Sequence, residues 1–312
     1  LVRGSLGLRG GAVGGLSRRP LGLQARGLGG GVHLALSLGV GGGTAAVLLC
    51  TLAVALGLGQ LRLGVGGGDA SGDGARKGEP LRVAAAADLA LAFKEVGAAF
   101  EKQSGKRVDF SFGSTGLLAK QIAEGAPFDV FAAANISFVD DVVREGACLG
   151  ETKALYAKGR IVMWSKDPWA LPKDIKDLED AKYAKVAIAN PEHAPYGRAA
   201  REALTKAGSW AAVEPRAVYG ENVQQTLMFA RSGNADVAIV ALSLAVTSPG
   251  NYTPIDPSLH APLDQALVVC KGGSKGPKTN EARAFVDYVG SDAGRAIMKR
   301  FGFLLPGETA SP

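Results

Sequence analysis

The chain has 312 residues, of which 47% are hydrophobic and 6% aromatic, and its formal net charge is +6. This length and apolar content suffice for two domains of ordinary size. Residues 1–81 carry eight basic and three acidic side chains, so the remainder of the chain is nearly neutral. Because the body has no cluster of Lys and Arg interleaved with aromatic residues, we expect no nucleic-acid partner.

Residues 1–80 have the composition of a leader. Residues 1–30 are rich in Arg, Gly and Leu without any acid, and an apolar run follows at 44–59. This pattern is typical of an export signal or an uncleaved signal anchor, and the run is near the lower length limit for a membrane span. A start assigned too far upstream is the alternative. Residues 65–80 form a Gly-rich polar linker, and we expect the folded body to begin near residue 81.

The first part of the body alternates between buried strands and amphipathic helices. The pattern predicts strands at 81–87 and 106–112, a turn and strand over 125–134, and helices at 89–100, after the turn 113–116 to about 124, and at 137–145. Asp88 precedes the first helix and is a natural N-cap. Alternating strands and helices indicate a mainly parallel sheet flanked by helices.

The second part repeats this architecture. We expect a long apolar segment at 154–164, a short helix ending near 178, strands at 185–189, 217–219, 235–241 and 263–271, and helices at 198–207, 221–231, 280–288 and 292–301. The strand at 263–271 is assigned to this second unit, as the strand by which the chain returns from it. The chain is therefore predicted to contain two α/β units.

Four turns between a strand and a helix are the candidate binding elements. They lie at Ala87–Asp88, Gly113–Gly116, Pro195–Gly197 and Glu221–Val223. Ligands of parallel α/β sheets lie beyond the carboxyl ends of the strands. The first N–H groups of a helix have no intrahelical partner and carry partial positive charge, so each turn can hold an anion without a side-chain cation.

The cysteines and histidines do not form a metal site or a catalytic group. Cys50, Cys148 and Cys270, like the three histidines, lack the spacing of a metal site, so we expect no bound cation. We expect buried free thiols, with a Cys148–Cys270 disulfide as the alternative. No Ser-His-Asp order, metal cluster or Walker-type phosphate loop is present, so an enzyme is not expected.

Several motifs together resemble the periplasmic molybdate-binding proteins of ABC importers, which are type II periplasmic solute-binding proteins. They occur in order from about residue 81 to 304 and comprise Ala-Ala-Ala-Ala-Asp-Leu at 84–89, Phe-Gly-Ser-Thr-Gly at 112–116, Gly-Ala-Pro-Phe-Asp-Val-Phe at 125–131, Asn-Pro-Glu-His-Ala-Pro-Tyr-Gly at 190–197, Glu-Asn-Val at 221–223 and Arg-Phe-Gly-Phe at 300–303. The resemblance implies a two-lobed, hinged fold, each lobe a mixed, mainly parallel sheet flanked by helices. Lobe I would comprise 81–157 plus 272–312, and lobe II 158–271.

The resemblance implies an anion-binding role for six residues of this sequence, each matched by its own position in a motif. The oxyanion-binding positions are Ala87, Asp88, Ser114, Thr115, Tyr196 and Val223. Thr115 occupies the usual binding position of its turn, Tyr196 would contribute its phenol, and Val223 its backbone N–H. The chain departs from the family at the first turn, where Ala87 has no side-chain donor and Asp88 is an acceptor when it is ionised.

The resemblance implies a protein that captures molybdate or tungstate outside the cytoplasm and delivers it to a membrane permease. It implies no cofactor, a monomer, and export or tethering through the N-terminal apolar segment. Two alternatives share the fold. One binds another oxyanion such as sulfate or phosphate, and the other is a membrane-tethered sensor or interaction domain, suggested by Ala87 and the run at 44–59.

Overall fold

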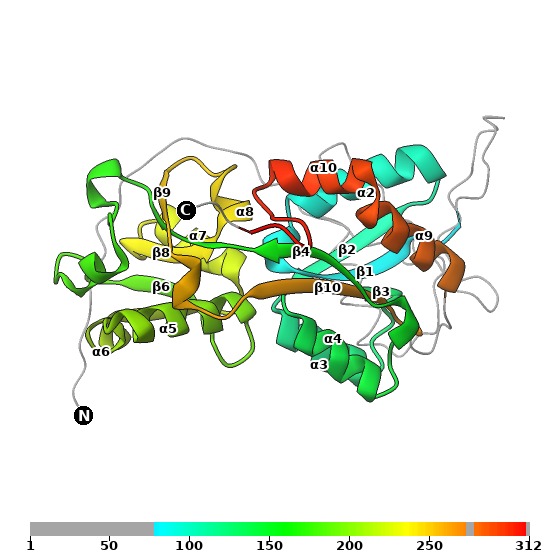
Figure 1. Cartoon of the computed structure of the whole chain (residues 1–312), viewed down its shortest axis with the longest axis horizontal. Helices are drawn as coiled ribbons and strands as arrows, with labels where there is room; N and C mark the ends of the chain where they lie inside the picture. The colour runs from blue at the N-terminus through cyan, green and yellow to red at the C-terminus, as the bar shows by residue number, and fades with distance from the viewer. Residues whose placement is uncertain (1–77, 273–277, 310–312) are drawn as a thin grey trace, which may run out of the picture. The chain divides into compact units, whose positions relative to one another are not determined.

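The computed structural model describes residues 78–272 and 278–309, which form two five-stranded sheets (Figure 1). The first sheet has the order β2-β1-β3-β10-β4, with β1 Leu81–Ala86, β2 Val108–Gly113, β3 Val130–Ala133, β4 Ala154–Gly159 and β10 Leu263–Val269. The second has the order β7-β6-β8-β5-β9, with β5 Ile161–Ser165, β6 Val186–Ala189, β7 Ala217–Gly220, β8 Val237–Ala241 and β9 Asn251–Pro254. In each sheet one strand, β10 or β5, runs against both of its neighbours. The two-lobed fold of mixed, mainly parallel sheets is confirmed.

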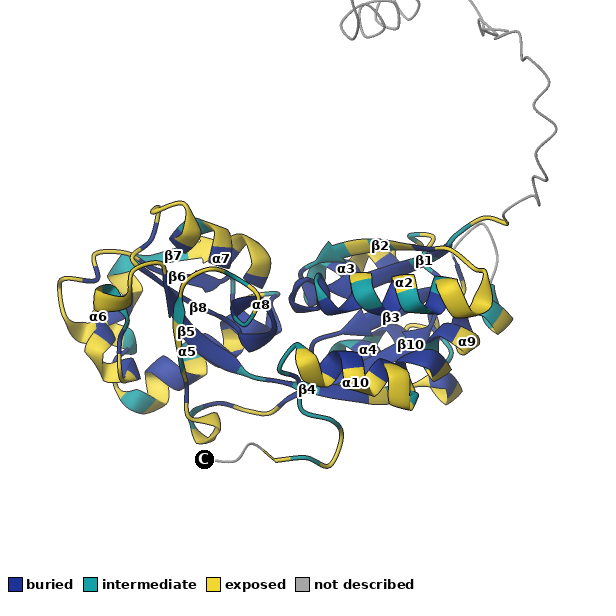
Figure 2. Cartoon of the chain, turned by 90° about the horizontal axis from the view of Figure 1, so that it is seen from above, coloured by how far each residue is buried: buried dark blue, intermediate teal, exposed yellow. Residues whose placement is uncertain are grey.

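Helices cover both faces of the first sheet. On one side lie α2 (Ala92–Ser104), α9 (Thr279–Gly290) and α10 (Asp292–Arg300), and on the other α3 (Thr115–Ala123) and α4 (Ile136–Arg144) (Figure 1). Val83 belongs to the apolar cluster of the first face and Ala84 to that of the second, because successive strand residues point to opposite faces. Both sheets are therefore largely buried (Figure 2).

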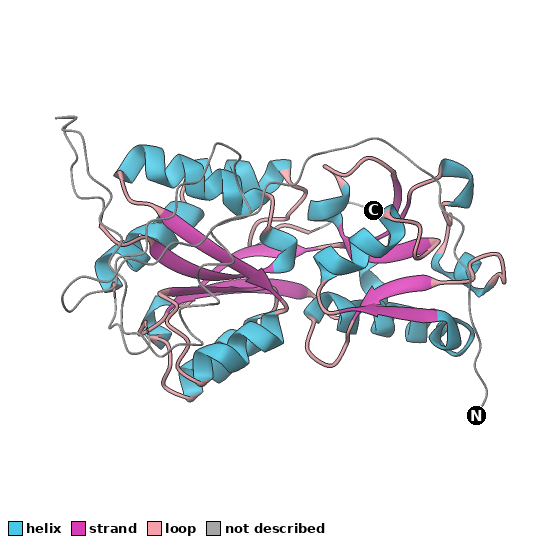
Figure 3. Cartoon of the chain, turned by 180° about the vertical axis from the view of Figure 1, so that it is seen from behind, coloured by secondary structure: helices cyan, strands magenta, loops and turns pink. Residues whose placement is uncertain are grey.

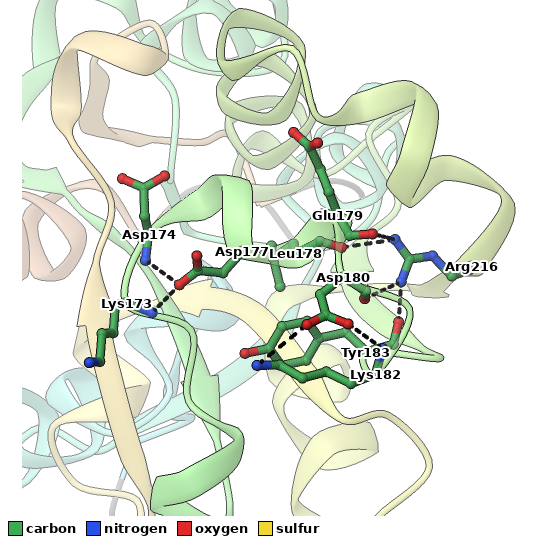
Figure 4. A network of polar contacts seen from close by, with 9 residues as sticks. All are labelled: Lys173, Asp174, Asp177, Leu178, Glu179, Asp180, Lys182, Tyr183 and Arg216. Atoms are coloured by element: carbon green, nitrogen blue, oxygen red, sulfur yellow. Dashed lines mark hydrogen bonds and ion pairs between the residues drawn. The ribbon is translucent and has the colours of Figure 1, made fainter.

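In the second lobe, α5 (Pro195–Ala207) and α7 (Val223–Arg231) pack against the sheet, and Figure 3 shows helices beside the strands of both sheets. The irregular segment before β6 is held by one side chain. The Arg216 guanidinium donates hydrogen bonds to four carbonyl oxygens (Figure 4), those of Leu178, Glu179, Asp180 and Tyr183. These bonds satisfy backbone acceptors that no strand or helix serves.

The chain passes between the two sheets at Arg160 and again between β9 and β10. The apolar segment 154–164 is two strands, β4 and β5, which belong to different sheets. The strand expected at 263–271 as the end of the second unit is β10, and it pairs with β3 and β4 of the first sheet. The second sheet is thus built entirely from β5–β9.

The expectation of free thiols is wrong for two of the cysteines. Cys148 and Cys270 form a disulfide, and their backbones form an antiparallel bridge. Cys148 follows α4 and Cys270 follows β10, so the bond ties the far end of β10 to the helical layer. The predicted leader and its apolar run lie almost entirely outside the described residues. Within 78–272 and 278–309, no helix has the length and apolar character needed to cross a bilayer.

Candidate functional site

Two of the predicted turns come from the first lobe. Thr115 is the first residue of α3 and Ser114 is its N-cap position. The Thr115 hydroxyl oxygen accepts a hydrogen bond from the Ala134 N–H at 3.2 Å. Because the hydroxyl also has one proton to donate, Thr115 retains a donor after this bond is made.

The other two turns come from the second lobe. Asn222 caps α7, and its side-chain oxygen accepts from the N–H groups of Gln224 and Gln225 at 3.1 and 3.0 Å. The cap leaves the preceding Val223 N–H, at the first helical position, without an intrahelical partner. At the start of α5, Pro195 has no N–H, so the Tyr196 N–H is the first donor of that helix.

These four turns meet at a small cavity between the two lobes. Its volume is about 10 Å³. All the residues that the sequence placed at the site line it: Ala87, Asp88, Ser114, Thr115, Tyr196 and Val223. Among the described residues that line it, Asp88 is the only Asp, Glu, His, Lys or Arg.

Asp88 lies at the centre of a buried hydrogen-bonded cluster. Its Oδ2 accepts from the Tyr196 hydroxyl at 2.8 Å and from Gln265 Nε2 at 2.7 Å. Gln265 Nε2 also lies 3.1 Å from the Tyr196 hydroxyl, and Gln265 Oε1 accepts from the Tyr156 hydroxyl at 2.8 Å. Burial raises the pKa of Asp88 to about 6, against the lowering effect of its hydrogen bonds from Gln265 and Tyr196.

The expectation that Asp88 caps the following helix is wrong. Asp88 lies inside a short 3₁₀ turn, Ala87–Leu89, and α2 begins four residues later with Leu91 at its N-cap position. The carboxyl is 1% exposed and contacts Tyr196 and Gln265, so it serves the site and not the helix start. The Tyr196 phenol donates to Asp88 Oδ2, whereas the sequence predicts that this phenol contributes to the ligand site directly.

A second contact joins the lobes at the mouth of the Ser114 turn. The Ser114 hydroxyl donates to the His193 carbonyl oxygen at 2.8 Å and lies 2.8 Å from His193 Nδ1. The Gly116 N–H donates to the same carbonyl at 2.9 Å. Ser114 therefore lines the cavity, but its hydroxyl donates its hydrogen bond to His193 of the opposite lobe.

Three residues of this site, Gln265, Tyr156 and His193, are not among the predicted site residues. Gln265 had a readable signal, since it is the one amide within the apolar strand Leu263–Val269 and is fully buried. A buried amide needs partners. Tyr156 and His193 had no comparable signal, because only the pairing of β4 with β10 and the closing of the lobes bring them to Gln265 and Ser114.

Two α/β lobes joined by two chain crossings, with helix starts from both lobes around one cavity, define a protein that encloses a small solute. The model of the family "Bacterial extracellular solute-binding protein" matches residues 81–304. The molybdate-binding protein ModA of Rhodobacter capsulatus is 35% identical over 222 residues, which is 71% of this chain and 86% of the relative. ModA of Azotobacter vinelandii is 33% identical over 234 residues, covering 73% and 91%.

The fold comparison agrees. The structure of the Azotobacter vinelandii periplasmic molybdate-binding protein superposes with a TM-score of 0.68 and 30% sequence identity, covering 72% of this chain and 99% of that one. The chain belongs to the family of bacterial extracellular solute-binding proteins.

Proposed function

We propose that this protein captures molybdate or tungstate between its two lobes and delivers the anion to the membrane permease of an ABC importer. The names of the two relatives that are at least 33% identical support the ligand class. The single observation that carries the proposal is the cavity where the starts of α3, α5 and α7 and the turn Ala87–Leu89 converge from both lobes.

The chemistry of the cavity suits a tetrahedral dianion, which has four acceptor oxygens and no donor. Thr115 offers a hydroxyl proton, and Val223 and Tyr196 offer backbone N–H groups at helix starts. The dipoles of α3, α5 and α7 add partial positive charge at the same place. No Lys or Arg is found among the described residues that line the cavity, so hydrogen bonds and dipoles supply the attraction, as in other helix-start anion sites.

The lobes act as two bodies around a hinge. The crossings at Arg160 and between β9 and β10 are the two covalent connections that link the sheets and form this hinge. Ser114, Gly116 and His193 hold the lobes closed over the ligand. The protein works as a monomer outside the cytoplasm, exported or tethered through its N-terminal segment, and it binds its ligand without converting it.

Thermal and urea denaturation with molybdate, tungstate, sulfate and phosphate tests the proposal. A ligand present at a hundred times its dissociation constant adds about 2.7 kcal/mol to the free energy of unfolding. We expect this increase with molybdate and tungstate. An increase with sulfate or phosphate alone would indicate a receptor for another oxyanion, and no increase with any of the four would indicate a sensor or interaction domain.

A further inference from the structure

One polar atom in the site has no hydrogen-bond partner. Among the described residues, Asp88 Oδ1 is one of three buried side-chain polar atoms without a partner. It belongs to a side chain that is 1% exposed and lines the cavity between the lobes. Buried polar atoms are almost always satisfied, so this oxygen indicates a partner in the cavity.

Among the residues that the structure describes, no positively charged side chain lines the cavity to compensate an ionised Asp88. The titratable groups that face it are Tyr196 of α5 and Tyr156 of β4, whose pKa values are raised well above the ordinary range by burial and by Asp88 itself, so both are neutral. The other elements around it present uncharged groups: Gln265 of β10, Ser243 of α8 (Leu242–Ala245), Thr115 of α3 and Val223 of α7.

The rest of the cluster leaves one place for a proton. Asp88 Oδ2 already accepts from Tyr196 and Gln265. The Gln265 amide is oriented by Tyr156, which donates to its oxygen at 2.8 Å, so its nitrogen faces Asp88. A proton on Oδ1 keeps all of these bonds and converts the unpartnered acceptor into a donor, on a residue that lines the cavity.

An oxyanion in the cavity strengthens this requirement. A dianion has acceptors alone, and an ionised carboxylate beside it would add a like charge and a second acceptor in a site shielded from water. Burial already raises the pKa of Asp88 to about 6 without any ligand, and a neighbouring dianion raises it further.

We propose that the site takes up one proton from solvent with each oxyanion dianion. Asp88 Oδ1 holds this proton and uses it to donate a hydrogen bond to the anion. The inference rests on the proposed function and deepens it. The only bond made is the O–H of the carboxyl, and the proton returns to solvent when the lobes open and the anion leaves. Asp88 is thereby a specificity residue that links oxyanion affinity to pH.

Isothermal titration calorimetry with molybdate measures this proton directly. Titrations at about pH 7.5 in two buffers of different ionisation enthalpy should give an uptake near one proton per anion. The dissociation constant should rise roughly tenfold per pH unit above about pH 7, because the fraction of ligand-free protein with a protonated Asp88 falls tenfold per unit. In Asp88→Asn the amide donates without titrating, so we expect no proton uptake and a dissociation constant that does not change with pH.

A matched control removes the same charge near the hinge. Asp264 precedes Gln265 on β10, is 46% exposed and pairs with Lys158 at 3.7 Å. Asp264→Asn should keep both the proton uptake and the pH dependence of the wild-type protein. An infrared difference spectrum of the wild-type protein, with and without molybdate, should show a protonated carboxyl band when ligand is present, and this measurement does not depend on how any variant folds.

Tight binding without proton uptake in the wild-type protein, or without a protonated carboxyl band, would overturn the inference and leave the proposed function intact. Uptake that persists in Asp88→Asn would overturn the assignment to Asp88. Failure of the wild-type protein to bind molybdate or tungstate at any pH would instead refute the proposed function.

Discussion

Removing the Thr115 hydroxyl tests whether the first turn of α3 binds the anion or only begins a helix. The hydroxyl oxygen accepts from the Ala134 N–H at 3.2 Å and keeps its own proton available at the cavity. Thr115→Val removes both functions while preserving the branched shape. Thr115→Ser keeps the hydroxyl and loses one methyl group, so it is the matched control.

The expected loss follows from the charge of the ligand. A hydrogen bond to a charged group contributes about 1.5–3 kcal/mol, so Thr115→Val should weaken oxyanion binding by roughly 10- to 150-fold. The same change leaves the Ala134 N–H without its acceptor, and a buried unsatisfied group costs about 1–3 kcal/mol. The unfolding free energy of the ligand-free protein should therefore fall as well.

Calorimetry with molybdate at one fixed pH measures the first effect, and urea denaturation without ligand measures the second. Because the two are separate measurements, a loss of affinity can be distinguished from a loss of folded protein. If Thr115→Val loses stability but binds the anion as tightly as Thr115→Ser does, the hydroxyl serves only Ala134. The assignment of Thr115 to the binding site would then be wrong.

Three further predictions concern the disulfide, the contact between the lobes and the buried carboxyl. Replacing Cys148 and Cys270 by Ala should lower the unfolding free energy by about 2–5 kcal/mol, measured with urea, because the bond closes a long loop. Gly116→Ala would place a Cβ 2.7 Å from the His193 carbonyl oxygen, so we expect the closed form to lose about 1–3 kcal/mol and calorimetry to show weaker oxyanion binding. For the ligand-free protein, the raised pKa of Asp88 means that the folded state binds this proton more tightly than the unfolded state does. Stability relative to Asp88→Asn is therefore highest below about pH 4 and should decline by roughly 3 kcal/mol in total as the pH rises through 6 to about 7.

Each of these predictions has a control. Reductant should lower the melting temperature of the wild-type protein and leave that of the cysteine double variant unchanged. Gly290→Ala adds a Cβ with no atom within 4 Å and should bind like the wild-type protein. Equal affinities for Gly116→Ala and Gly290→Ala would show that the His193 contact does not limit closure. A stability difference at Asp88 that is flat between about pH 4 and pH 6 would show that its carboxyl has an ordinary pKa in the folded state.

Most helices and strands of the body could be predicted because their signals are local. The strand Leu81–Ala86 and the helix after Thr115 follow from apolar runs and from the small residues between them. The segment 154–164 could not be divided from its composition, because β4 and β5 are both apolar and are separated only by Arg160. Its guanidinium donates to the Gly302 carbonyl at 2.8 Å, a contact between residues 142 positions apart.

The same limit applies to the prediction that Asp88 caps a helix. The residue type before a helical pattern indicates a cap, but capping requires that the side chain turn back on its own helix start. The partners that turn it away, Tyr196 and Gln265, lie 108 and 177 positions along the chain. The position and partners of this buried carboxyl are therefore determined by polar groups distant in the sequence and not by its neighbours in the chain.

The order of motifs along the chain was enough to determine the two α/β lobes and the residues of the four turns, because strands, helices and their junctions depend on neighbouring residues. The tertiary structure alone decided the Cys148–Cys270 bond, the place of β10 in the first sheet and the cluster around Asp88. Each of these joins residues more than a hundred positions apart, or strands whose pairing is set by packing in the core. The first two depend on the packing of the first lobe and the third on the meeting of both lobes, so no local pattern specifies them.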